Sequence, residues 1–490
     1  MTQVADSSAT FTKATVQGTT WRYLTFFTSK AALLISTAVL ARLLSKDDFG
    51  VMGYALTAIN FLDIFSDMGI GPALIYYPES KKTASTAFWL NLLTSLLLCG
   101  FTWLCAPLAA LYFRDERATE VIRMLSLVFP IIALGSTHQK LIEKKLAFNR
   151  TFLPEFLRSL SKAGVTIALA FLGFGVWSLI LGQLCSEVVS TVAYWISSAW
   201  MPSIVTDRES AGSLLSYGFR YVGADAVAVL LLNLDYLLVG RYLGAVALGV
   251  YTLAFRLPDL VVLQFARTLS GVVFPVYSRM RETSGDMARG FLLTTRYISL
   301  ITIPLGAGLA LVAKPFTELV FSDKWVDAVP AIQGLAIYSM LLSLAYNAGG
   351  AYKASGRPQI ITWLGLIRVA MLFPALWWAV SGPGTIVAVS WMHALVAFIS
   401  ALLSLHVAAR VLNIGVKAVY SAIYPAAVAG CVMAAAVYGV LILAATMLPF
   451  IQLLLGFFVG GIVYLLVLWF FQRDVVVEAG HKLRAAFGQR

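Results

Sequence analysis

Residues 217–278 read YGFRYVGADAVAVLLLNLDYLLVG, RYLGAVALG and VYTLAFRLPDLVVLQFARTLSGVVFPVYS in succession. The first and third of these runs are long and apolar enough to cross a bilayer, which takes roughly 20 residues. They nevertheless contain charged residues, and a charge at the bilayer centre costs at least ~2.5–3.5 kcal/mol on insertion scales. The stretch therefore predicts membrane-spanning helices whose charged side chains face a bundle interior or a water-filled cavity.

The charges of this stretch form stripes on the predicted helices. They are Arg220, Asp225, Asp235, Arg256, Asp259 and Arg267. At about 100° per residue, Arg256 and Arg267 lie only ~20° apart around the helix, and Asp259 is about 60° away. Arg220 and Asp235 fall within about 60° of each other. One interpretation is neutral Arg–Asp pairs that hold helices together, with Arg256–Asp259 as the best case, and the other is a binding site.

The composition indicates the class of protein. Of 490 residues, 60% are hydrophobic and 12% are charged, whereas a soluble domain has about 25% charged residues. We predict an all-α polytopic membrane protein, because a β-barrel would show short alternating segments. The net charge of +12 does not indicate nucleic-acid binding, since the basic residues are scattered between apolar runs. The polar N-terminal stretch has no apolar core, so no removable signal peptide is expected.

Motifs of metal, redox and catalytic sites are missing from the sequence. The four cysteines, Cys99, Cys105, Cys185 and Cys431, lie in apolar runs without a C-x-x-C pair. Gly-rich phosphate loops, H-E-x-x-H and G-x-S-x-G do not occur. We therefore expect no metal, no cofactor and no enzyme activity.

We predict fourteen membrane spans. They cover approximately residues 20–43, 49–76, 83–111, 119–137, 151–173, 175–199, 214–240, 244–276, 290–312, 327–347, 359–380, 384–408, 418–446 and 450–471. The corresponding regions are a polar N-terminus (1–19), an N-lobe of six spans (20–212), a C-lobe of six spans (213–412), two final spans (413–471) and a tail (472–490). Lys and Arg are concentrated in alternate loops, which places both termini in the cytoplasm.

An internal repeat supports two pseudo-symmetric lobes. Residues 42–55 read RLLSKDDFGVMGYA and residues 241–254 read RYLGAVALGVYTLA. Without gaps, Arg42 aligns with Arg241, Gly50 with Gly249 and Val51 with Val250, and each stretch joins the first two spans of its half. Six spans is an even number, so the halves share one orientation. This predicts a pseudo-two-fold axis along the membrane normal, with the site between the lobes.

The remaining intramembrane charges are mostly basic and define the candidate site. With those of the opening stretch, the cations are Lys30, Arg158, Lys162, Arg220, Arg256, Arg267 and Arg296. Excess positive charge within a bundle predicts an anionic ligand, and phosphate or diphosphate suits Arg and Lys. The acidic candidates for a coupling ion are Asp63, Asp67, Asp225, Asp235 and Asp259, although Asp63 and Asp67 also fit ion pairs with neighbouring helices.

Residues 41–75, ARLLSKDDFGVMGYALTAINFLDIFSDMGIGPALI, resemble the opening of the Wzx-type polysaccharide-export flippases. These belong to the multidrug/oligosaccharidyl-lipid/polysaccharide exporter superfamily, and the similarity is to its colanic-acid and exopolysaccharide exporters. The resemblance implies a two-lobed, V-shaped bundle in the bacterial inner membrane. It implies translocation of an undecaprenyl-diphosphate-linked oligosaccharide by alternating access, alongside polymerase and chain-length or export proteins. The family has no strict catalytic motif, so the candidate cations come from the helices alone.

Two other functions remain open from the sequence. A multidrug or organic-cation antiporter of the same superfamily would share the fold but favour an acidic or neutral cavity. A membrane glycosyltransferase or polymerase would use Asp47 and Asp48 as an acidic metal-binding motif in the first outer loop. We favour a helix N-cap for these two aspartates, since such enzymes also need sizeable outer loops.

The loop charges predict which residues face outward. In a cysteine-free background, a cysteine at Glu116 should react with a membrane-impermeant thiol reagent added outside. A cysteine at Gly285 should react only after the membrane is permeabilised. The reverse pattern of labelling would overturn the orientation and the lobe assignment together.

Overall fold

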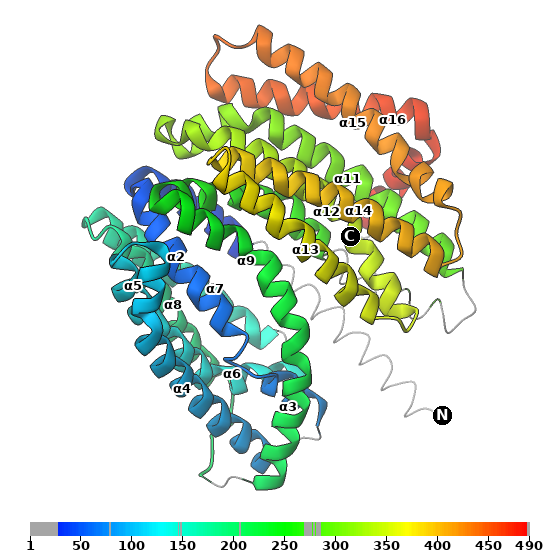
Figure 1. Ribbon diagram of the computed structural model, residues 1–490. Coiled ribbons are helices and arrows are strands. Elements are labelled where there is room, and N and C mark those ends of the chain that lie inside the picture. Colours follow the sequence, from blue (N-terminus) through cyan, green and yellow to red (C-terminus); the bar gives the residue numbers. More distant parts are fainter. Residues whose placement is uncertain are drawn as a thin grey trace. The chain divides into compact units, whose positions relative to one another are not determined.

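The computed structural model describes residues 28–77, 80–145, 147, 149–204, 207–268, 277, 280 and 286–487, with backbone alone for 208, 217–226 and 472–487. Regular structure in this part of the chain is helical throughout, and it contains no strand (Figure 1). The predicted all-α class is confirmed.

The helices follow one another with short connections. After a helix over residues 28–43, the first half contains α2 (Lys46–Asp63), α3 (Ile70–Tyr76), α4 (Lys81–Phe113), α5 (Arg117–Ser126), α6 (Val128–Lys144), α7 (Asn149–Phe171), α8 (Val176–Ser197) and α9 (Arg208–Pro258). The second half contains the π-helix η1 (Asp259–Leu263), α11 (Met287–Phe316), η2 (Thr317–Phe321), η3 (Asp323–Ala328), α12 (Val329–Ala354), α13 (Gln359–Ser381), α14 (Ile386–Val411), α15 (Val416–Leu443) and α16 (Pro449–Phe487).

Ten helical segments in the described chain are long and apolar enough to cross a membrane. This agrees roughly with the fourteen predicted spans. The predicted span 49–76 is not continuous, because the chain turns between α2 and α3 at Met68 and Gly69, whose φ angles are 42° and 70°. In α9, Gly244 has φ 82° and ψ −176°, which breaks the helix where the eighth span is predicted to begin.

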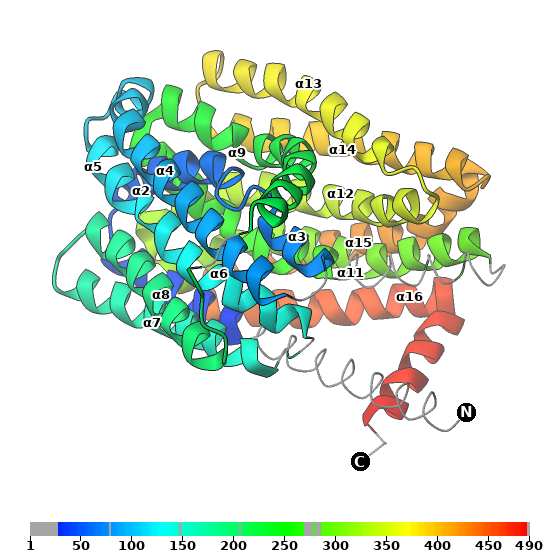
Figure 2. The same cartoon turned by 90° about the horizontal axis from the view of Figure 1, so that it is seen from below.

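The chain divides into two compact units, Met1–Gly249 (unit 1) and Val250–Arg490 (unit 2). In unit 1, α7 packs along α8, and α8 in turn contacts α6, which packs on α4 (Figure 2). In unit 2, α12 packs between α11 and α14, α13 covers α14, and α15 and α16 pair beside α11. The lobe boundaries predicted at 212/213 and 412/413 remain predictions.

The start of α2 explains the acidic pair in the first predicted outer loop. Ser45 is the N-cap: its Oγ accepts a hydrogen bond from the Asp48 backbone N–H at 3.1 Å, and the Asp48 carboxylate accepts one from the Ser45 N–H at 2.9 Å. This is a capping box, which satisfies amide groups that the helix leaves unpaired. The N-cap interpretation predicted an aspartate at the cap itself, whereas Asp48 instead lies three residues into the motif.

Within unit 1, residues 46–50 of the first repeat stretch pack directly on residues 245–249 of the second. A Cβ on Gly50 would lie 1.8 Å from the carbonyl oxygen of Ala245, and a Cβ on Gly249 would lie 1.9 Å from that of Lys46. In the ungapped alignment of the repeat, Gly50 corresponds to Gly249 and Lys46 to Ala245. The two contacts are thus the same contact made twice, which is what a local two-fold axis requires.

This contact predicts a strict need for glycine at both positions. Gly50→Ala or Gly249→Ala should lower the thermal unfolding temperature of the purified protein in detergent, because a side chain there overlaps a backbone oxygen. Gly100→Ala in α4 is the matched control, since a Cβ there meets nothing within 4 Å. That control should be neutral or stabilising, because alanine favours a helix over glycine by about 1 kcal/mol. Equal unfolding temperatures for all three variants would contradict the close contact.

Candidate functional site

A buried carboxylate links α7 and α8 in unit 1. Glu187 on α8 is 3% exposed. Its Oε1 accepts hydrogen bonds from Arg158 Nη2 at 2.6 Å and Arg158 Nε at 3.1 Å, and a third from Gln183 Nε2 at 2.7 Å. A buried charge is costly unless it is paired and hydrogen-bonded in this way. Arg158, one of the predicted cations, is therefore held by an acid on the neighbouring helix.

Further polar side chains extend this pair in both directions. Lys162 Nζ donates to the side-chain oxygen of Gln183. On the other side, Glu155 Oε2 lies 3.8 Å from Arg158 Nη1, and Tyr194 donates its hydroxyl to Glu155 Oε1 at 2.8 Å. We call these side chains the α7–α8 cluster: Glu155, Arg158, Lys162, Gln183, Glu187 and Tyr194.

The α7–α8 cluster is open on its cationic side. The Arg158 side chain is 38% exposed, against 4% for that of Glu187, and Lys162 is also exposed. Ser159 on α7 bonds to Ser29 at 3.0 Å between their Oγ atoms, so the helix that carries the half-buried Lys30 contacts α7. Three predicted cations thus belong to two contacting helices.

A second charged group, in unit 2, lies in the last part of residues 217–278. Arg267 Nη2 pairs with Asp259 Oδ1 at 3.0 Å, and its Nη1 donates to Gln264 Oε1 at 3.3 Å. Its Nε lies 3.4 Å from the Tyr346 hydroxyl on α12. The predicted stripe therefore contains an ion pair between Asp259 and Arg267, and Arg256 is half-buried. The Arg267 side chain remains 36% exposed.

The other candidates are distributed over several elements. Arg296 is half-buried on α11, and Asp235 is buried on α9. Arg220 and Asp225 lie in helical backbone, and their side chains are outside the described part of the structure. The convergence of all seven cations on one cavity remains a prediction.

Asp63 and Asp67 do not share one helix, because the turn at 64–69 separates α2 from α3. Asp63 is exposed and accepts a hydrogen bond from Ser66 Oγ at 2.7 Å. Asp67 accepts the Gly71 backbone N–H at 3.0 and 3.1 Å, at the start of α3. An acid at a helix N-terminus is stabilised there by the helix dipole, which gives Asp67 a local role in the fold.

The first-loop aspartates are also engaged in the fold. Arg117 donates hydrogen bonds to both carboxylate oxygens of Asp47, and its Nη2 lies 2.8 Å from Oδ2 of Asp115. The hydrogen bond from Arg117 holds the pKa of the Asp115 carboxyl below its ordinary value. Among the described side chains, no three of the His, Cys, Asp or Glu type are grouped as metal ligands would be.

Several polar partners at these clusters were missed by the sequence interpretation. Gln183, Glu155 and Tyr194 complete the α7–α8 cluster, and Tyr346 completes the group around Arg267. A signal was present for two of them, because Glu155–Arg158 and Gln183–Glu187 have the i,i+3 and i,i+4 spacing of helix neighbours. No such signal marks the tyrosines, which pair across helices.

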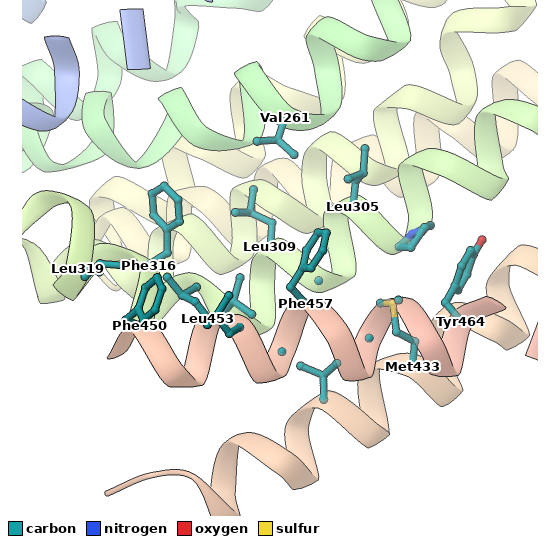
Figure 3. Close-up of a pocket in the computed structure, with 18 residues that line it drawn as sticks. Val261, Leu305, Leu309, Phe316, Leu319, Met433, Phe450, Leu453, Phe457 and Tyr464 are labelled. Carbon is teal, nitrogen blue, oxygen red and sulfur yellow. The ribbon is translucent and has the colours of Figure 1, made fainter. Parts of the chain in front are cut away.

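An apolar groove of about 580 Å³ lies among η1, α11, α15 and α16 in unit 2. Figure 3 shows Phe450, Leu453 and Phe457 of α16 facing Leu309 and Phe316 of α11. Its lining side chains are apolar apart from the hydroxyl of Tyr464, which is bonded to the Leu300 carbonyl at 2.8 Å. The groove can therefore hold a hydrocarbon but offers no polar group to a sugar or phosphate.

A solved structure has a similar architecture. The structure described as "Lipid II flippase MurJ, inward closed conformation" superposes with a TM-score of 0.76 at 16% identity, over 93% of this chain and 99% of that one. The two chains share a fold.

Several curated proteins resemble this chain in sequence, and two of them are described here. Teichuronic acid biosynthesis protein TuaB of Bacillus subtilis (strain 168) is 26% identical over 84% of this chain and 86% of its own length. Lipopolysaccharide biosynthesis protein WzxC of Escherichia coli (strain K12) is 25% identical over 74% of each chain.

A protein-family model also matches this chain. Residues 39–330, more than half of the chain, match the model described as "Polysaccharide biosynthesis protein". The match includes residues 41–75, which carry the resemblance to polysaccharide exporters, and that resemblance is confirmed. This chain is a member of the polysaccharide biosynthesis protein family.

Proposed function

We propose that this protein is a flippase, not an enzyme, that moves polyprenyl-diphosphate-linked oligosaccharide units across the bacterial inner membrane for exopolysaccharide or lipopolysaccharide biosynthesis. The names of its relatives support the pathway, and the fold shared with a lipid II flippase supports the type of transport. The loop charges support cytoplasmic termini. The other members of the pathway, such as a polymerase and chain-length proteins, are the expected protein partners.

The observation that carries this proposal is the presence of half-exposed arginines on helices within the bundles. Arg158 pairs with Glu187 and, at 3.8 Å, with Glu155, and Arg267 pairs with Asp259, yet each arginine exposes more than a third of its side chain. An arginine in this state retains N–H groups for an anionic ligand, and its guanidinium matches the geometry of phosphate. We assign Lys30, Arg158, Lys162, Arg220, Arg256, Arg267 and Arg296 to the binding of the diphosphate. Several separated cations suit a site that must also release its cargo.

The apolar groove supports the lipid part of the same substrate. A polyprenyl chain is a long hydrocarbon, and the groove offers it an apolar lining between α11 and α16. Gly308 and Gly461 both line the groove, and at both positions an added Cβ would meet nothing within 4 Å. These glycines leave open space that a lipid chain can fill.

The alternative functions receive less support. A structure of a multidrug resistance MATE transporter also shares the fold, with a TM-score of 0.61 at 16% identity, but that likeness concerns the fold alone. For a glycosyltransferase or polymerase, Asp47 and Asp48 would have to bind a metal, whereas they are engaged with Arg117 and the α2 cap. The coupling ion remains a proposal, with Asp63, Asp67, Asp225, Asp235 and Asp259 as the acids inferred from sequence.

The cationic site predicts the effect of removing single charges. Arg158→Ala or Arg267→Ala should abolish polymer export at near-normal protein abundance, and Arg→Lys should retain part of it. A lost charge-assisted hydrogen bond is worth about 1.5–3 kcal/mol, or roughly ten- to hundredfold in affinity. The exposed Arg410, at the end of α14, provides the control Arg410→Ala, which should export normally. Low abundance of the Ala variants would favour the helix-pairing interpretation, and full export by inserted variants would refute the cationic site.

The groove predicts that export can be blocked without removing a charge. Gly308→Leu and Gly461→Leu should fill the groove and reduce export in a complementation assay, without lowering the unfolding temperature. Gly439→Leu on α15 is the matched control, because Gly439 also has open space at its Cβ but does not line the groove. Normal export by both groove variants would remove the groove from the transport path.

A further inference from the structure

Arg368 is a cation at membrane depth that the proposed function has not used. It lies near the middle of α13, one of the helical segments that are long and apolar enough to cross a membrane. Its Nη2 donates a hydrogen bond to the hydroxyl of Tyr338 on α12 at 3.1 Å, and Tyr338 is only 2% exposed. The side chain of Arg368 is thus directed from α13 toward the interior of unit 2.

No acid neutralises Arg368 in the described part of the chain. Its guanidinium makes one hydrogen bond, to a neutral phenol, and lies 5.8 Å from the centre of the same Tyr338 ring. Asp259 of η1, which packs on α12, is bonded to Arg267 instead. Arg158 and Arg267, by contrast, each pair with a carboxylate. A charged side chain inside a bilayer is costly, and such residues usually have a function.

Most N–H groups of Arg368 have no acceptor among the described residues. Atom Nε is buried without a partner. Atom Nη1 has no partner either, but unlike Nε it is not buried, so it reaches accessible space. Phosphate oxygens fit a guanidinium of this kind, which can donate two parallel hydrogen bonds. The accessible part of Arg368 therefore suits a phosphate ligand.

Two tyrosines of α12 relate Arg368 to the Arg267 group. Tyr338 binds Arg368, and the Tyr346 hydroxyl lies 3.4 Å from Arg267 Nε. At 1.5 Å per residue, the two tyrosines are about 12 Å apart along the helix. Tyr346 is nearer the end of α12 that has Lys353 in its last turn, and the loop charges predict this end to be cytoplasmic. Unit 2 thus has arginines at two levels of α12.

We propose that Arg368 is a second binding position for the diphosphate of the lipid-linked substrate, further from the cytoplasm than Arg267. Membrane lipids keep their phosphates outside the hydrocarbon core, so a phosphate at the middle of a span belongs to a molecule that is crossing it. The diphosphate binds first at Arg267 and then at Arg368. Because no carboxylate competes for its N–H groups, Arg368 can take the phosphate without breaking an ion pair. This inference rests on the proposed function, since it needs a diphosphate-linked cargo.

The first test measures whether a phosphate occupies Arg368 in the wild type. Phenylglyoxal modifies accessible guanidinium groups, and mass spectrometry of the digested protein gives the extent of reaction at each arginine. In purified full-length protein in detergent, Arg368 should react, and saturating farnesyl diphosphate should slow this reaction severalfold. Farnesol and phosphatidylglycerol should leave the rate unchanged. The exposed Arg410 at the end of α14 is the control, which should react equally with and without ligand.

The second test separates binding from a structural role. Arg368→Met removes the charge and keeps a long side chain. Since no acid loses a partner, the unfolding temperature in detergent should equal or exceed that of the wild type, while polymer export should fall about tenfold or more at normal abundance. Arg158→Met is the matched comparison. It should lower the unfolding temperature, because Glu187 is 3% exposed and would lose its cation.

The outcomes separate this position from the function. Protection of Arg158 and Arg267 but not of Arg368, or no reaction of Arg368 in the empty protein, would overturn the second position and leave the flippase proposal intact. A clearly lower unfolding temperature for Arg368→Met would make Arg368 a structural residue. Equal protection by phosphatidylglycerol would assign the position to a membrane lipid.

Two further outcomes concern the proposed function itself. Protection of none of the three arginines by farnesyl diphosphate would overturn the cationic site and the second position together. Protection of Arg368 in a protein whose deletion leaves polymer export unchanged would refute the proposed function alone.

Discussion

Charge inside a bilayer must be paired or hydrated, and this requirement organises the polar chemistry of the protein. Glu187 is buried because Arg158 and Gln183 satisfy it, and Arg158 remains half-exposed because the carboxylate occupies only one edge of its guanidinium. In unit 2, Asp259 also pairs with a half-exposed arginine, Arg267, although its own side chain is 28% exposed. In both groups an acid keeps an arginine in place without burying it. In the proposed site, the acids would thus hold the cations that bind the substrate.

The sequence predicted the helices well, because hydrophobic length and loop charge are local properties. The fourteen predicted spans agree roughly with the helices of the described chain, ten of which are long and apolar enough to cross a membrane. The errors came from backbone geometry. A helical reading of 49–76 cannot show that Met68 and Gly69 adopt positive φ angles and divide it. The same error placed Asp63 and Asp67 within one continuous span.

The candidate site was less predictable, because its partners lie on different helices. Helical periodicity placed Arg256, Asp259 and Arg267 on one stripe, and an ion pair does join two of them. It could not match Arg158 with Glu187, which are 29 residues apart, nor add Tyr346 from α12. The apolar groove left no signal at all, since leucine and phenylalanine in a span look the same whether they face lipid or a cavity. Such features depend on how helices pack, which a single sequence does not encode locally.

The contact between residues 46–50 and 245–249 has a consequence for the origin of the chain. Each stretch meets the other through equivalent residues, and each needs a glycine at the same place. Two separate copies of a half-length protein could form this contact as a symmetric homodimer, since an isologous interface requires only one surface that fits itself. Duplication and fusion of one gene would then join the partners without altering the interface. After fusion, each glycine could mutate without a change in the other. The close approach of the two stretches nevertheless requires glycine at both positions.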